Sequence, residues 1–287
     1  MYHVILAGGQ GHRFWPKSRS DKPKQLLKLF GDQSMIRLTY NRINKISSSD
    51  KIFIVASRKL SNLINKEIPE VPKKNYIIEP SGKNTASAIG LAAAHISKID
   101  DDAIMGIYPA DHLIIGDEKF KKIILNSKKQ VEKKSILITI GIKPSFPSTG
   151  YGYIEYEKNN DKNKVYKVKT FLEKPKLNKA KKFIKNDVFL WNAGMFVWKA
   201  NTILKEIKLY MPDLFCSLDN IQNSINTPYY SKVLKSEWEL IQPESIDYGI
   251  LEKTKKVYTI LADFKWNDLG TWYSLFKALE KNNEKNH

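Results

Sequence analysis

Short apolar runs alternate with amphipathic stretches through the first half of the chain, and this pattern predicts the elements there. The apolar runs predict strands at 4–7, 51–55, 76–78, 103–108 and 136–142. Helices are predicted between them at 34–46, 84–99 and 117–132. Each predicted helix begins at a residue that caps helices well, namely Ser34, Asn84 or Asp117. Strands that alternate with helices are typical of a parallel sheet with helices on its faces.

The second half turns to a β-rich pattern before it returns to helices. Residues 151–173 predict paired strands, and 188–199 predict either a further pair or one long bent strand. The remaining predicted elements are helices from 200 to about 235, a strand at 257–261, a loop at 266–270 and a helix at 271–279. No linker rich in Pro, Gly or Ser divides the chain, so we expect one α/β domain over residues 1–287, with a Rossmann-like mixed sheet flanked by helices.

The composition is that of an ordinary globular chain. The 287 residues can bury a substantial core, and 42% of them are hydrophobic. The only cysteine is Cys216, which excludes an intramolecular disulfide and a thiol-rich metal site. No stretch approaches the roughly 18 uninterrupted apolar residues of a membrane span, and the first apolar run is too short for a signal peptide. We therefore expect a cytoplasmic protein with no membrane partner.

The formal charge of +18 raises the alternative of a nucleic-acid-binding protein, because basic proteins bind polyanions. Only five of the 48 basic residues are arginine, so the planar guanidinium groups that read bases are scarce. The lysine runs lie on amphipathic stretches and are interpreted as solvated helix faces. No nucleic-acid partner is expected.

A glycine-rich loop follows the first predicted strand. Gly8, Gly9 and Gly11 let the backbone approach an anion closely, and Arg13 and Lys24 supply positive charge nearby. Ligands of open α/β sheets bind beyond the carboxyl ends of the strands, which is where this loop lies. The sequence therefore predicts a phosphate-binding loop over the active crevice.

Two better-known glycine loops do not match this segment. A dinucleotide-binding loop that starts at Gly9 needs glycine where the chain has Phe14. A Walker A loop needs Gly-Lys-Ser/Thr where the chain has Arg13 followed by Phe14 and Trp15. A glycine turn that merely joins a strand to a helix would explain the glycines but not the basic residues beside them.

Further short segments occur at 23–25, 79–86, 108–112, 149–154, 171–175, 191–194, 245–248 and 266–270, and all but the first contain glycine, asparagine or an acidic residue. Together with the glycine loop they resemble, in their order along nearly the whole chain, the motifs of sugar-1-phosphate nucleotidyltransferases, and most of all those of the mannose-1-phosphate guanylyltransferases. The resemblance implies a GT-A-like fold in which about 1–142 binds the nucleotide and about 143–287 binds the sugar phosphate. It also implies a transferase without the isomerase module of longer relatives.

The chemistry that the resemblance implies is attack by a sugar-phosphate oxygen on the α-phosphorus of a nucleoside triphosphate, with pyrophosphate leaving in line. Such a site needs cations because several anions meet in it. Asp111 and Asp268 each follow a strand-like segment and resemble the metal-binding pair of the family, and Mg²⁺ (or Mn²⁺) suits a few carboxylates plus phosphate oxygens. Arg13 and Lys24 are expected to stabilise the leaving pyrophosphate.

The same resemblance gives the expected contacts of the substrates, GTP and mannose 1-phosphate. The nucleotide is expected against Leu6, Gly8, Gly9, Gly11, Arg13, Glu79, Gly82, Asn84, Thr85, Pro109 and Asp111. The sugar phosphate is expected against Gly152, Glu173, Lys174, Asn192 and Asp247. No general base is required, because the attacking phosphate is already ionised, so His12 and His112 are interpreted as positioning groups. Trp191 is either a sugar platform or a buried core aromatic.

Departures from the usual motifs leave alternatives open. They are Lys83, Ser87, Ser148 and Ala193, where arginine, proline, glutamate and serine are common. These four departures leave the identity of the sugar and the selection of the base open, so an enzyme that makes a GDP-heptose, a dTDP-sugar or a UDP-sugar stays an alternative. A non-catalytic sugar-nucleotide sensor is a third, although it should have lost one of the proposed catalytic charges. A homodimer is expected by analogy alone.

Overall fold

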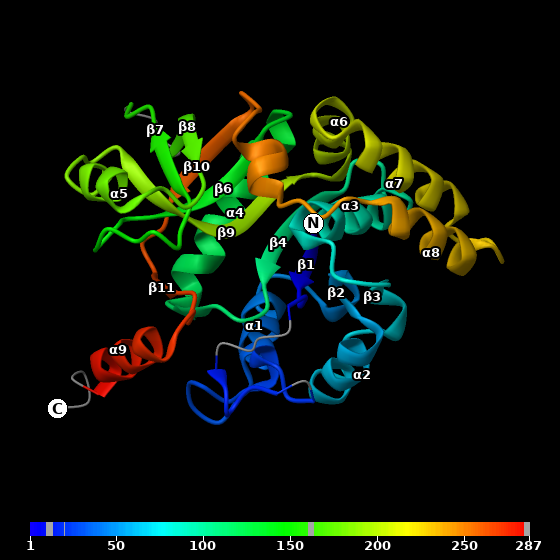
Figure 1. The fold of residues 1–287 in the computed structure, drawn as a ribbon, viewed down its shortest axis with the longest axis horizontal. Helices are drawn as coiled ribbons and strands as arrows, with labels where there is room; N and C mark the ends of the chain where they lie inside the picture. The colour runs from blue at the N-terminus through cyan, green and yellow to red at the C-terminus, as the bar shows by residue number, and fades with distance from the viewer. Residues whose placement is uncertain (10–13, 20, 160–163, 284–287) are drawn as a thin grey trace.

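The computed structural model describes residues 1–9, 14–19, 21–159 and 164–283, and they form a three-layered α/β fold (Figure 1). The strands of the large sheet are β1 (Tyr2–Leu6), β2 (Ile52–Ser57), β3 (Tyr76–Glu79), β4 (Ile104–Pro109), β6 (Leu137–Ile142), β7 (Tyr153–Tyr156), β8 (Val165–Leu172), β9 (Phe189–Lys199) and β10 (Val257–Leu261). Their order across the sheet is β3-β2-β1-β4-β9-β6-β10-β8-β7. The predicted mixed sheet flanked by helices is confirmed.

Helices cover both faces of this sheet. One face packs against α1 (Met35–Asn44), α2 (Arg58–Glu67) and α4 (Asp117–Lys133). The other packs against α3 (Asn84–Ser97), α6 (Ala200–Tyr210), α7 (Pro212–Ser224) and α8 (Tyr230–Leu240). Successive strand residues face opposite ways, so Val4 lies in one core and Ile5 in the other. Both cores are apolar because the central strands are covered on both sides.

The first four strands form a parallel block in which β1 pairs with β2 and β4, and β2 pairs with β3. This is the parallel sheet that the alternation of strands and helices predicts. It places the carboxyl ends of β1 and β3, and therefore Gly8 and Glu79, at one edge of the sheet.

The long strand β9 joins the two halves of the chain. It pairs antiparallel with β4 through residues 196–199, with β6 through residues 191–197 and with β7 through residues 189–191. Of the two patterns that residues 188–199 allow, the structure therefore has the single long strand. Strand β6 belongs to the first half of the sequence, yet it lies between β9 and β10 of the second half. One continuous sheet thus serves both halves.

Several elements were not predicted from the sequence, or were predicted with other bounds. The missed elements are α2, β5 (Leu113–Ile115), α5 (Leu177–Phe183) and a π-helical turn (Asp247–Leu251), and β11 (Lys265–Asn267) extends into the predicted loop at 266–270. The last helix, α9, spans Trp272–Asn283. The prediction of Asn84 as a cap is wrong by one residue, because α3 begins at Asn84 itself. Its φ is 71°, and its Oδ1 accepts a hydrogen bond from the adjacent Thr85 N–H.

In the described part of the chain, no helix has the length and apolar character needed to cross a membrane.

Candidate functional site

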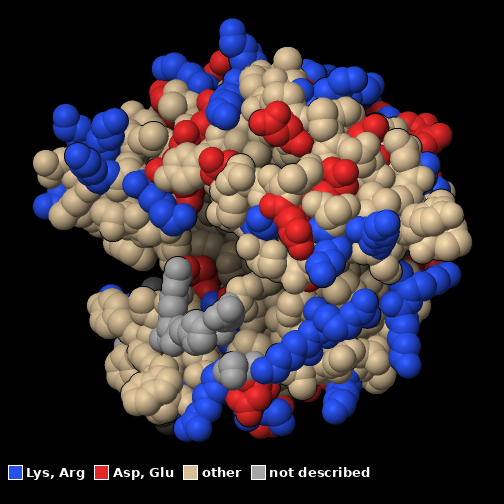
Figure 2. Space-filling model, turned by 45° about the vertical axis from the view of Figure 1, so that its right-hand side comes forward, with Lys and Arg blue, Asp and Glu red and all other residues tan. Residues whose placement is uncertain are grey.

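A cleft of about 720 Å³ opens at the carboxyl ends of the parallel strands and reaches into the β-rich half. Figure 2 shows it as a hollow with acidic side chains inside, while lysine and arginine side chains are spread over the surrounding surface. The cleft is lined by the following predicted site residues: Leu6, Gly8, Gly9, Glu79, Gly82, Asn84, Thr85, Pro109, Asp111, Gly152, Glu173, Asn192, Asp247 and Asp268. Lys24 and Lys174 are not lining residues, but each forms an ion pair with one: Lys24 with Asp111, and Lys174 with Glu173. Gly11 and Arg13 lie outside the described residues.

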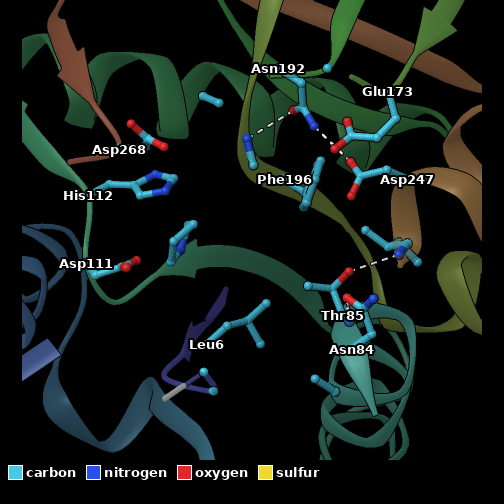
Figure 3. A pocket seen from close by; sticks show the side chains of 18 of the residues that line it. Leu6, Asn84, Thr85, Asp111, His112, Glu173, Asn192, Phe196, Asp247 and Asp268 are labelled. Atoms are coloured by element: carbon cyan, nitrogen blue, oxygen red, sulfur yellow. Dashed lines mark hydrogen bonds between the residues drawn. The ribbon is translucent and has the colours of Figure 1, made fainter. Parts of the chain in front are cut away.

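The two predicted metal ligands are brought together by a small antiparallel ribbon. Strand β5 pairs with β11, with Leu113 opposite Asn267. This register places the residues just before β5 beside those just after β11, so Asp111 and Asp268 emerge at the same end of the ribbon (Figure 3). The residues are far apart in sequence, and the pairing that joins them involves only three residues of each strand.

Lys24 links these two acidic residues. Its Nζ lies 2.7 Å from Oδ2 of Asp111 and donates a 2.6 Å hydrogen bond to the backbone oxygen of Asp268. The Lys24 side chain is 8% exposed, whereas that of Asp111 is 29% exposed. Burial tends to raise the pKa of Asp111, but the charge of Lys24, its hydrogen bond and the other groups around the carboxylate together outweigh burial and keep that pKa below its usual value. Asp111 is therefore an ionised carboxylate at neutral pH.

Gln25 holds the backbone of the glycine loop in place. It belongs to the motif at 23–25, and no role was predicted for it from the sequence. Its Nε2 donates hydrogen bonds to the backbone oxygens of Ala7, Gly8 and Gly9 at 2.9–3.2 Å. In a trans peptide the next N–H points opposite to the carbonyl, so the amides of Gly8 and Gly9 point away from Gln25. Gly9 also has a φ of 95°, which favours glycine. These amides are thus available to an anion.

Glu79, at the end of β3, places a buried carboxyl group at the end of the cleft that lies beside the glycine loop. Glu79 is 6% exposed, and its carboxyl group lies beside Gly8. A Cβ at Gly8 would be in ordinary van der Waals contact with Oε2, at 3.5 Å. Among the described residues, Glu79 has no hydrogen-bond partner. Burial raises its pKa to about 7. Because this carboxyl group lines the cleft and bonds to no other described side chain, it suits a ligand that offers hydrogen-bond donors.

At the opposite end of the cleft, Asn192 of β9 is the centre of a hydrogen-bond network. Its Oδ1 accepts bonds from the hydroxyl of Thr139 at 2.8 Å and from the N–H of Gly194 at 3.0 Å. These two donors fix the orientation of the amide, whose Nδ2 then donates to Oδ1 of Asp247 at 2.9 Å (Figure 3). Thr139 is fully buried and was not among the predicted site residues.

Asp247 and Glu173 bring two carboxyl groups together at this end (Figure 3). Burial raises the pKa of Asp247 to about 7, and the nearby charge of Glu173 adds to the shift. Glu173 is oriented through its backbone N–H, which donates to Glu252, and its carboxylate accepts a bond from Lys174 at 2.5 Å. A Cβ at Gly152 would lie 2.4 Å from Oε2 of Glu173, so glycine is needed there for the carboxylate to enter the cleft.

Two aromatic residues position the acidic end of the cleft. The Tyr151 hydroxyl donates a 2.7 Å hydrogen bond to Oδ1 of Asp268. The indole N–H of Trp266 donates to Nδ1 of His112 at 3.2 Å, which fits the interpretation of His112 as a positioning group. Neither Tyr151 nor Trp266 was assigned a role from the sequence, although both lie in the quoted motifs.

Trp191 belongs to the core. It is 4% exposed, and its ring packs edge-on against those of Phe146 and Tyr151. Of the two interpretations that the sequence left open, the structure therefore supports the buried aromatic.

Comparison with known proteins gives a family and several relatives. A family model described as "Nucleotidyl transferase" matches residues 2–285. The mannose-1-phosphate guanylyltransferase of Salmonella montevideo is 35% identical over 292 residues, which is 99% of this chain and 61% of that protein. The chain thus spans about three fifths of the length of this curated relative.

Solved structures agree with the fold. A Thermus thermophilus protein described as "mannose-1-phosphate geranyltransferase" has a TM-score of 0.86 and 25% identity, over 96% of this chain and 78% of its own. A Helicobacter pylori protein described as "mannose-6-phosphate isomerase" has a TM-score of 0.75 and 28% identity, over 93% of this chain and 98% of its own.

Proposed function

The chain belongs to the nucleotidyl transferase family, and on this premise we propose that it transfers GMP from GTP to α-D-mannose 1-phosphate, giving GDP-mannose and pyrophosphate. The observation that supports this best is a single cleft with three chemically distinct regions. Lys24 and two aspartates form one, Glu79 and the glycine loop a second, and Asn192 with its carboxylate neighbours the third. The similar proteins whose names mention a mannose phosphate support the choice of sugar.

Glu79 supports guanine as the base. Guanine presents two adjacent donors, N1–H and the 2-amino group, which a carboxylate can accept together. Adenine has an acceptor at N1 and no 2-amino group, so it cannot offer this pair of donors to the ionised carboxylate of Glu79. Leaving such a group unpaired gives strong discrimination between bases. We place the base between Glu79 and the 82–85 loop, with Leu6 and Pro109 beside it.

The phosphates are placed at Lys24 and the glycine loop. The amides of Gly8 and Gly9 offer donors to phosphate oxygens, and Lys24 offers a charge that stabilises the leaving pyrophosphate. Arg13 and Gly11 keep the phosphate-binding roles that the sequence predicts for them. Because Lys24 now neutralises Asp111, triphosphate binding requires this lysine to share its charge between the carboxylate and the phosphate.

Asp111 and Asp268 fit a divalent cation, and a divalent metal is general in this family. Both are carboxylates at one end of the β5–β11 ribbon, and Asp111 stays ionised. Two hard oxygen ligands and a nearby triphosphate suit Mg²⁺, which keeps several waters and takes few protein ligands. Bound there, the ion would neutralise phosphate charge and orient the α-phosphate for attack.

We place the sugar at Asn192, Asp247 and Glu173, where the carboxylate oxygens of Asp247 and Glu173 accept hydrogen bonds from ring hydroxyls and the remaining Nδ2 hydrogen of Asn192 can be donated to one. Lys174, which pairs with Glu173, is the proposed partner of the sugar's phosphate. In the reaction a phosphate oxygen of mannose 1-phosphate forms a bond to the α-phosphorus of GTP. The bond between the α-phosphorus and the oxygen that bridges it to the β-phosphorus breaks. Pyrophosphate leaves with both electrons, and no proton needs to be removed from the nucleophile.

The test is pyrophosphate release with Mg²⁺, with GTP, ATP, UTP and dTTP crossed against mannose, glucose and heptose 1-phosphates. Release with GTP and mannose 1-phosphate, and its loss in Asp111→Asn, is expected. Release with another pair would replace the substrates proposed here and keep the chemistry. No release with any pair would contradict the proposed function and favour the non-catalytic sensor.

A further inference from the structure

Hydrogen bonds join residues 81–86, the loop and first turn of α3 next to the proposed base site, to the segment at residues 238–246, which begins at the end of α8. We call this contact the loop–segment junction. Its bonds run from Trp238 Nε1 to Ser81 O at 2.9 Å, from Lys83 Nζ to Ile241 O at 2.8 Å, from Ile246 N to Thr85 Oγ1 at 2.9 Å and from Ala86 N to Glu244 O at 3.1 Å. Neither segment is part of the large sheet, so these bonds, together with the shared apolar core, hold one in position relative to the other.

The junction ends directly at Asp247. Ile246 is the residue before the π-helical turn that begins with Asp247, and the first N–H groups of such a turn lack partners within it. Thr85 supplies the missing acceptor for Ile246, as a capping side chain would, but from a different element (Figure 3). Asp247 in turn accepts the bond from Asn192. The Thr85 hydroxyl therefore lies one residue from the carboxylate proposed to bind the sugar.

Thr85 also belongs to the nucleotide end. It lines the cleft beside Asn84 and Gly82, and its own N–H is held by Oδ1 of Asn84. Asn84 has a left-handed backbone, with a φ of 71°, which fixes the path of the chain into Thr85. A base that rests against this loop restricts the position of the Thr85 hydroxyl.

We propose that Thr85 is a positioning residue that transmits nucleotide binding to Asp247, so that the nucleotide and the sugar phosphate bind with positive coupling. This inference rests on the proposed function. A nucleotide at the loop restricts its motion, and through Thr85 and Ile246 it also restricts the turn that carries Asp247. The sugar phosphate then meets Asp247 in a position that the nucleotide already holds in place, and it binds more tightly. By linkage, it strengthens nucleotide binding by the same factor.

Lys83 gives the inference a second, independent test. Its Nζ donates to the backbone oxygens of Ile241 and Glu239, at 2.8 and 3.4 Å, at the end of α8. Lys83 is not among the residues that line the cleft. Removing its ammonium group therefore loosens the loop–segment junction without removing a contact to either substrate.

The experiment measures mannose 1-phosphate binding by calorimetry, with and without a GTP analogue that has a methylene group between the α- and β-phosphorus and cannot react. We expect the analogue to tighten mannose 1-phosphate binding to the unmodified protein by about tenfold. In Thr85→Val this ratio should fall close to one, while Thr85→Ser, which keeps the acceptor, should retain it. Lys83→Met should lower the ratio part of the way, and Lys83→Arg should retain it.

An unchanged ratio in Thr85→Val, or a lost ratio in Thr85→Ser, would overturn the inference. So would a ratio of one in the unmodified protein that nonetheless binds both ligands, which leaves the proposed function intact. If the unmodified protein binds no mannose 1-phosphate under either condition, the proposed function fails and the inference fails with it. Thermal unfolding of each variant shows whether it is folded, and the Lys83 pair decides the question if Thr85→Val does not fold.

Discussion

The hydroxyl of Tyr151 donates a 2.7 Å hydrogen bond to Oδ1 of Asp268, a residue 117 positions further along the chain. The N–H of Gly270 donates to the same oxygen at 3.1 Å. In the part of the chain that the structure describes, Oδ2 of Asp268 has no hydrogen-bond donor. One oxygen of this carboxylate is therefore fixed by the protein and the other is available to a ligand, which is how outer residues orient metal ligands.

The first prediction follows for Tyr151→Phe, which removes this bond and keeps the ring. We expect the Mg²⁺ concentration for half-maximal pyrophosphate release to rise by about 10- to 100-fold, because loss of such a partner weakens metal binding to that extent. The measurement is a Mg²⁺ titration of the initial rate. Tyr156→Phe is the matched control, since the Tyr156 hydroxyl bonds to Asp187 away from the cleft and its loss should leave the titration unchanged.

The second prediction concerns Lys24. Replacement by methionine keeps most of the side-chain volume and removes the charge that pairs with Asp111 and faces the proposed triphosphate. We expect kcat to fall by about 100- to 1000-fold, the usual loss when a group that stabilises developing charge is removed. Steady-state pyrophosphate release measures it. The exposed Lys28→Met serves as the control, and a Lys24→Met enzyme with normal kcat would contradict the proposed role.

The third prediction concerns the base. In Glu79→Gln the amide offers donors as well as an acceptor, so the fit to N1–H and the 2-amino group of guanine is lost. We expect kcat/KM for GTP to fall by about 10- to 100-fold. Inosine triphosphate lacks the 2-amino group and should be a poorer substrate than GTP for the unmodified enzyme. The two nucleotides should become nearly equal for the variant, and an unchanged preference would count against Glu79.

Glu79 also affects the stability of the folded chain, and its raised pKa determines how that effect changes with pH. The carboxyl group has a pKa of about 7 in the folded chain, above its ordinary value of 4.5. Its contribution to stability is complete below the unfolded value and is lost as the pH rises through about 7. Glu79→Gln should therefore raise Tm relative to the unmodified protein under alkaline conditions and have little effect under acidic ones. Thermal unfolding without ligands tests this.

The fourth prediction is a pH profile. Asp247 has its pKa raised to about 7 by burial and by Glu173, so its charged form predominates only above that pH. We expect kcat/KM for mannose 1-phosphate to rise as the pH increases through about 7. Asp247→Asn should be less active and should lose this increase. Because the substrate phosphate titrates equally in both assays, a profile of identical shape in the variant would assign the increase to the substrate instead.

The fifth prediction concerns metal removal. Dialysis against a chelator should abolish pyrophosphate release, and Mg²⁺ should restore it, because Asp111 and Asp268 otherwise face the triphosphate without a cation between them. Calorimetry of mannose 1-phosphate should show that binding persists after chelation, since Asn192, Asp247 and Glu173 need no metal. Full activity after chelation would contradict the proposed metal pair.

The sequence predicts most of the fold because the apolar strands are long and continuous. Strand β10 lies where residues 257–261 predict it, and the parallel β1–β4 block follows from its alternation with helices. Helix α2 was missed because only Leu60, Ser61 and Ile64 are buried in it, too few for a clear period. Ribbon β5–β11 was missed because strands of three residues give no pattern, and tertiary pairing alone creates them.

The site too was predicted from the sequence in part and missed in part. Most of the residues that line the cleft were identified through motifs, and the exceptions are Val55, Ala88, Phe196 and Pro243. The residues that orient the lining residues were not identified, because Gln25, Thr139 and Tyr151 act through bonds to partners 16 to 117 positions away. A hydroxyl or an amide has no local pattern that reveals such a distant partner. Only the fold shows which polar side chains are already committed to another residue.

The position of β6 bears on how the protein is made. Its two neighbours in the sheet, β9 and β10, both come later in the chain, and all six of its residues are buried in the finished fold. On the ribosome this apolar strand is synthesised long before either partner, and pairing on its second edge must wait for residues 257–261. A nascent chain that stalls before residue 257 would therefore expose an unpaired strand of the kind that associates with other chains. Protection by a chaperone during synthesis is consequently expected to matter more for this enzyme than for a protein whose strands pair in the order in which they emerge.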